Sequence, residues 1–65
     1  MNVAIMSVLI SAFANKYNIL WTNDANENWH LCYNKAMDEG EDEILEMMEE
    51  VESRGLVETF FRLVD

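Results

Sequence analysis

The side chains that could do chemistry in this chain are mainly carboxylates, and most of them lie in one stretch. Residues 38–52, DEGEDEILEMMEEVE, hold nine acidic residues and no basic one. The rest of the chain carries four acids and four bases, so the formal net charge of −9 comes from this stretch alone. Carboxylates can act as general acids, as metal ligands or as a negatively charged binding surface.

Acid–base or nucleophilic catalysis is not indicated. A carboxyl group that works as a general acid needs burial to raise its pKa, and an open helix face does not provide that. His30 and Cys32 are two residues apart, which on a helix turns their side chains about 200° from each other. We therefore expect an exposed His30 and a small core residue at Cys32. The sequence also lacks a Ser/His/Asp set and a glycine-rich phosphate loop, so we predict a non-enzymatic protein without a cofactor.

A metal site is not predicted either. Residues 24–28, DANEN, begin like a calcium-binding EF-hand loop, but the sixth position is Trp29 instead of glycine and the twelfth is Lys35 instead of glutamate. A second frame at the head of the acidic stretch also lacks the glycine. Asp24 and Glu27 fit a capping box at the start of a helix instead.

The charge pattern of the acidic stretch is itself unfavourable. It contains nine pairs of acids spaced three or four residues apart, and each pair costs a helix about 0.2–0.5 kcal/mol. Together they cost on the order of 2–3 kcal/mol, a large share of the stability of a domain of 65 residues. Two interpretations follow: a solvated face that only confers solubility, or a surface that meets a basic partner.

The second interpretation gives a specific candidate surface. As a helix of about 22 Å, the stretch carries one charge per ~2.5 Å, close to the one per ~1.7 Å of duplex DNA. We predict that it docks on a basic, nucleic-acid-binding surface of a partner protein, with Leu45 as an apolar anchor among carboxylates. The predicted contact residues are Asp42, Glu43, Leu45, Glu46, Glu49 and Glu50. The acidic balance disfavours direct binding of nucleic acid or of a membrane surface.

In size and charge the chain resembles the small acidic inhibitors that phages encode against host nucleic-acid enzymes. The likeness is one of general character and no sequence motif carries it. It implies an inhibitor that acts as a DNA mimic, with carboxylates in the places of phosphates.

A self-associating protein is the alternative. Residues 3–14, VAIMSVLISAFA, are almost continuously apolar. They are too short to span a bilayer, and no basic residue precedes them as in a secretory signal. As a helix they are apolar on more than one face, which requires more than one covering neighbour. A structural or regulatory homodimer through residues 3–14 would meet that need, with the acids serving solubility only. A single cysteine fits a reducing, cytoplasmic location.

The elements form one small domain over residues 1–65. The chain has no proline and two glycines, and its apolar spacing predicts an all-α, compact bundle of three to four short helices. We expect helices over 3–14, 25–38, 41–53 and 56–65, with a terminal strand as the alternative for the last of them. Residues 17–22 are expected to form an extended connector.

The buried faces of the middle two helices follow from the same spacing. They are expected to carry Trp29, Cys32, Tyr33, Ala36 and Met37 on one helix and Ile44, Met47, Met48 and Val51 on the next, with the five methionines mainly filling the core. The alternative is an α+β fold with an N-terminal hairpin, in which residues 3–10 and 17–22 pair as strands and pack on two or three helices.

Overall fold

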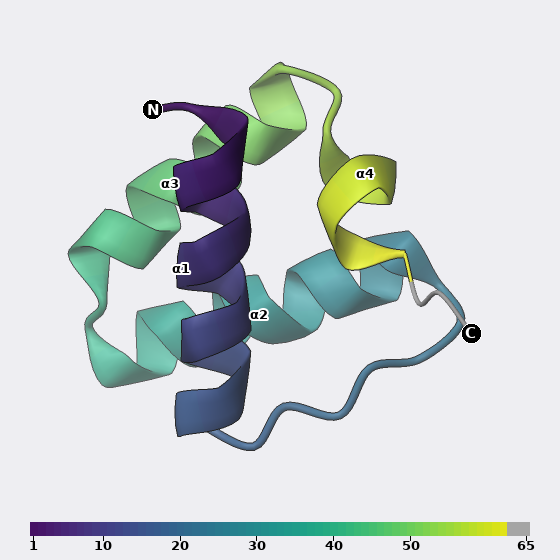
Figure 1. The fold of residues 1–65 in the computed structure, drawn as a ribbon. Helices are drawn as coiled ribbons and strands as arrows, with labels where there is room; N and C mark the ends of the chain where they lie inside the picture. The colour runs from purple at the N-terminus through teal and green to yellow at the C-terminus, as the bar shows by residue number, and fades with distance from the viewer. Residues whose placement is uncertain (63–65) are drawn as a thin grey trace.

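A computed structural model describes residues 1–62 and contains four helices. They are α1 (Val3–Lys16), α2 (Ala25–Glu39), α3 (Asp42–Ser53) and α4 (Val57–Phe61) (Figure 1). The predicted all-α class is confirmed. The alternative hairpin over residues 3–22 is wrong, because residues 3–16 are helical and the chain from there to α2 is an irregular connector. The predicted end of the last helix, residues 63–65, lies outside the described residues.

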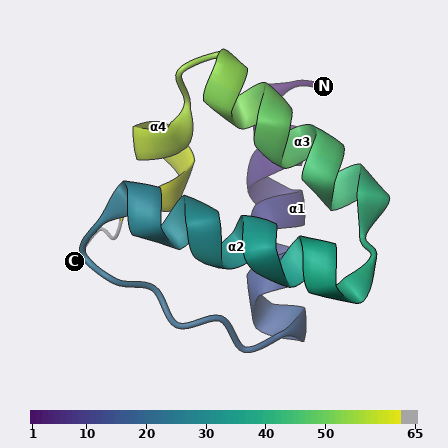
Figure 2. The same cartoon turned by 180° about the vertical axis from the view of Figure 1, so that it is seen from behind.

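The helices are arranged in two layers. α1 crosses in front of α2 and α3 in Figure 1, and the reverse view in Figure 2 shows α2 and α3 in front of it. The Cα atoms span 30 × 24 × 17 Å. Packed helices lie about 8–10 Å apart, so two layers account for the short dimension. α1 therefore crosses one of the two broad faces of the molecule.

The start of α2 and the turn into α3 follow the local sequence. The Asp24 side chain accepts a hydrogen bond from the backbone N–H of Glu27 at 3.1 Å, as an N-cap residue should. The backbone N–H of Asp24 donates to the Thr22 hydroxyl at 3.1 Å. Thr22 thus supplies the acceptor that a capping box would take from Glu27. Gly40 ends α2 at a φ of 67°, a left-handed conformation that glycine adopts without strain.

All four helices contribute to one apolar core. The buried apolar residues are Met6, Ile10, Phe13, Ala14, Ala25, Trp29, Cys32, Ala36, Ile44, Met47, Met48, Val51 and Phe61. The Trp29 indole N–H donates to the backbone carbonyl of Met48 at 3.0 Å, which joins α2 to α3. Ile19 and Trp21 of the connector pack against this core.

The methionines depart from the prediction. Three of the five are completely enclosed, namely Met6, Met47 and Met48. Met37 was expected on the buried face of α2 but is 57% exposed, and Met1 is exposed too. Met37 lies in the last turn of α2, where the chain is already turning through Gly40 into α3. No neighbouring helix covers it there, so the apolar spacing continues beyond the packed part of the helix.

Asn28 is the one buried polar side chain in the described part of the chain, and no sequence pattern indicated it. Its amide nitrogen donates to the backbone carbonyls of Phe61 at 2.7 Å and Thr22 at 3.0 Å. Its amide oxygen accepts from the backbone N–H of Thr22 at 2.7 Å and from the Thr22 hydroxyl at 3.1 Å. This single side chain joins α2 to the connector and to the end of α4.

Cys32 is a core residue, as predicted, and its thiol is expected to be unreactive. The residue is 1% exposed, and burial raises the pKa of the thiol to about 12. At pH 8 the native protein should react with a disulfide reagent such as DTNB at least about a thousandfold more slowly than the unfolded chain, because only the thiolate attacks. Stopped-flow absorbance with and without denaturant measures both rates. Equal rates would contradict the burial of Cys32.

The same pKa shift makes the stability depend on pH at the alkaline end. Burial favours the neutral thiol, so the contribution of Cys32 to stability is complete below the thiol's ordinary pKa. It is lost progressively as the pH rises from there toward about 12.

No helix within residues 1–62 has both the length and the apolar character needed to cross a membrane.

Candidate functional site: an acidic wall on α3

The two sides of α3 differ sharply. Ile44, Met47, Met48 and Val51 form its buried stripe. The other side carries five exposed carboxylates, which we call the acidic wall: Asp42, Glu43, Glu46, Glu49 and Glu52. At 100° per residue, Asp42, Glu46 and Glu49 fall directly opposite the buried stripe. The acids of α3 are therefore gathered on one exposed surface, with Glu43 and Glu52 on its two flanks.

Three basic side chains and the N-terminal ammonium pair with acids that lie outside the acidic wall. The ion pairs are Lys16–Glu41 at 2.8 Å, Lys35–Glu39 at 3.7 Å, Arg54–Glu50 at 3.0 Å and the N-terminal ammonium of Met1 with Glu50 at 3.6 Å. Within residues 1–62, no ion pair reaches the acidic wall. The paired positive charges lie around the edges of α3, and its central carboxylates remain unneutralised.

Glu41 fixes the first end of α3. Its carboxylate accepts hydrogen bonds from the Lys16 ammonium at 2.8 Å and from the Tyr17 hydroxyl at 2.7 Å, both at the end of α1. The bond from Lys16, followed by that from Tyr17, lowers the pKa of Glu41. The bond to Glu41 also raises the pKa of Lys16, so both groups stay charged near neutral pH. Glu41 thus ties α1 to α3 and does not belong to the acidic wall.

Glu50 fixes the other end. Its carboxylate accepts a hydrogen bond from the Arg54 guanidinium at 3.0 Å, and that guanidinium also donates to the backbone carbonyl of Met1 at 3.0 Å. The side chain of Glu50 is half-buried in this cluster. The structure therefore places this predicted contact residue at the edge of the surface, with its charge already partly balanced.

Leu45 is also at an edge. It is half-buried and packs against the core, where the sequence pattern predicted an apolar knob surrounded by carboxylates. Of the six predicted contact residues, the structure brings four together on the exposed surface, and Leu45 and Glu50 border it. The role of Leu45 as an anchor stays a prediction.

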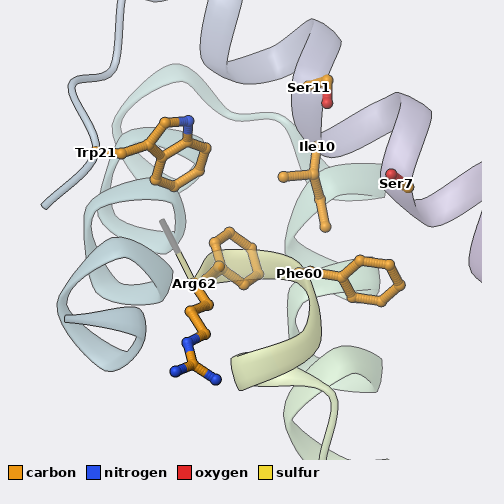
Figure 3. Close-up of a pocket in the computed structure, with 7 residues that line it drawn as sticks. Ser7, Ile10, Ser11, Trp21, Phe60 and Arg62 are labelled. Atoms are coloured by element: carbon orange, nitrogen blue, oxygen red, sulfur yellow. The ribbon is translucent and has the colours of Figure 1, made fainter. Parts of the chain in front are cut away.

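A separate cavity of about 240 Å³ lies between α1, the connector and α4 (Figure 3). Its lining includes Ser7, Ile10, Ser11, Trp21 and Phe60. Figure 3 shows the guanidinium of Arg62 extending away from Ile10 and Trp21. The cavity is smaller than the roughly 300–1,000 Å³ of ordinary ligand pockets, and no acid–base pair converges on it. The acidic wall is the more distinctive feature of the surface.

No protein-family model, curated protein or solved structure matches the chain.

Proposed function

We propose that the chain is a non-enzymatic interaction protein whose acidic wall docks on a basic surface of a partner protein, a surface that ordinarily binds nucleic acid. The observation that carries this proposal is the row of exposed carboxylates on α3 that the basic groups of residues 1–62 leave unneutralised. Such a row repels itself, and a cationic groove removes the repulsion on binding.

The spacing of the charges supports a groove shaped for a phosphate backbone. The acidic wall carries five acids over the twelve residues of α3, which is about 18 Å of helix and one charge per ~3.6 Å. Duplex DNA presents one charge per ~1.7 Å of its axis, or one per ~3.4 Å along each strand. Lysine and arginine side chains that contact successive phosphates therefore meet carboxylates at a comparable density along α3.

The rigidity of α3 supports docking as well. Four buried side chains hold one side of the helix in the core, and Glu41 and Glu50 fasten its two ends to α1 and to the N-terminus. The carboxylates therefore project from a fixed backbone, and the ordering cost on binding falls mainly on their own side chains. In this mode the protein inhibits its partner sterically, because it occupies the groove that nucleic acid would enter.

Competition with DNA tests the proposal. The immobilised chain is exposed to a cell extract freed of nucleic acid, and retained proteins are challenged with duplex DNA at constant ionic strength. We expect duplex DNA to release the partner, because both ligands occupy the same basic surface. A partner that stays bound in saturating duplex DNA contradicts the proposal, as does the absence of any specifically retained protein.

A further inference from the structure

Within residues 1–62, α1 is covered on only one side. Met6, Ile10, Phe13 and Ala14 point into the core. The opposite side exposes a second apolar row, which we call the outer seam: Ala4, Ile5, Val8 and Ala12. Ile5, Val8 and Ala12 follow one another at steps of three and four residues, the spacing at which a helix packs lengthwise against another helix.

The outer seam is uneven in shape as well as apolar. Val8 is 67% exposed and stands beside a shallow hollow of about 280 Å³. Ala4, Ile5, Leu9 and Asn2 form the rest of the lining of this hollow. A protruding apolar side chain next to an apolar hollow can fit a copy of itself across a two-fold axis, as symmetric dimer interfaces require.

The distribution of charge indicates which partner can approach this surface. α1 contains no acidic residue, and its one basic side chain, Lys16, is bonded to Glu41. The acidic wall belongs to α3, in the layer behind α1 in Figure 1. Two molecules of charge −9 repel each other least when they meet through an uncharged face. A basic protein is attracted to the acidic wall instead, and anionic lipid is repelled by the molecule as a whole.

We infer that the outer seam of α1 is a self-association surface, on which a second copy of the chain packs its own outer seam. The inference stands independently of the proposed function. Each α1 is about 21 Å long, and it crosses a broad face that is comparable in extent to the ~800 Å² that each partner buries in a standard interface. A contact centred on one helix uses only part of that face. The dimer interface is therefore small, and the dimer dissociates reversibly on dilution.

Sedimentation of two matched variants tests the inference. We expect the wild-type chain to pass from monomer to dimer as its concentration rises to millimolar. Val8→Glu should weaken the dimer at least about 100-fold, because it places two facing charges in an apolar contact. Leu20→Glu adds the same charge at an 84% exposed leucine of the connector and should leave the dimer unchanged. Circular dichroism establishes that both variants are folded.

The dependence on salt concentration distinguishes this inference from the proposed function. Dimerisation of like-charged molecules should strengthen as salt rises, whereas binding of a basic partner should weaken. A wild-type chain that stays monomeric at millimolar concentration overturns the inference, including when it binds zwitterionic vesicles through α1. So does a Val8→Glu variant that dimerises like the wild type. Neither result affects release of a partner by DNA.

Discussion

Asn28→Ala is expected to remove a large part of the protein's stability against unfolding. The Asn28 side chain is completely buried and makes four hydrogen bonds, to Thr22 and to the end of α4. Its removal leaves the backbone N–H of Thr22 and the carbonyl of Phe61 without their partners in a closed site. A buried polar group left unpaired costs about 1–3 kcal/mol, so the substitution should cost roughly 3–5 kcal/mol. A domain of this size has only about 3–10 kcal/mol in total.

Urea denaturation followed by circular dichroism measures this loss. Asn34→Ala is the matched control, because Asn34 lies on the same helix and is exposed. We expect it to change the free energy of unfolding by no more than about 0.5 kcal/mol. An Asn28→Ala protein as stable as Asn34→Ala would show that the hydrogen-bond network does not hold α4 and the connector in place.

Reversing two charges at the centre of the acidic wall, Glu46→Lys with Glu49→Lys, is expected to weaken partner binding by about 100-fold or more. Each reversal replaces an attraction to the basic groove by a repulsion, and tenfold per site corresponds to only about 1.4 kcal/mol. The same double variant should be about 1–2 kcal/mol more stable than the wild type. The lysine introduced at position 46 would lie three or four residues from Asp42, Glu43 and Glu50, and the one at position 49 three residues from Glu52. Binding and stability thus change in opposite directions.

A second double variant controls for total charge. Glu27→Lys with Glu58→Lys changes the net charge equally, at exposed positions on α2 and α4. We expect it to retain most of the binding measured by surface plasmon resonance. Equal losses in the two double variants would mean that only the overall charge matters, and the acidic wall would then have no special role.

Much of the fold could be predicted from the sequence because the signals are local. The apolar spacing of α2 and α3, the Asp24 cap and Gly40 placed their ends within one or two residues. Residues 3–14 were harder, since a short apolar run is compatible with a strand as well as a helix. Contacts with the other helices decide between strand and helix, and these contacts are known only once the rest of the fold is known.

The features that the sequence did not reveal depend on contacts between distant residues. Asn28 resembles any polar residue near the start of a helix, and its burial appears only when α4 and the connector close over it. Glu41 could not be separated from the other acids by spacing alone, because its partners Lys16 and Tyr17 lie far away in the chain. Glu50 pairs with Arg54 four residues on, a spacing that is visible in the sequence, but also with the distant N-terminal ammonium of Met1. The sequence thus located the acidic surface but not which carboxylates remain free.

The most direct test of the acidic wall is the salt dependence of binding to the partner released by DNA, measured by titration of the purified pair. We expect the affinity to fall at least about tenfold between ~50 mM and ~200 mM salt, because the contact joins exposed charges of opposite sign. The wild type and the Glu46→Lys, Glu49→Lys variant should converge in affinity as salt rises. An affinity that is independent of salt would contradict the account, since the unneutralised carboxylates of α3 would then contribute nothing to recognition.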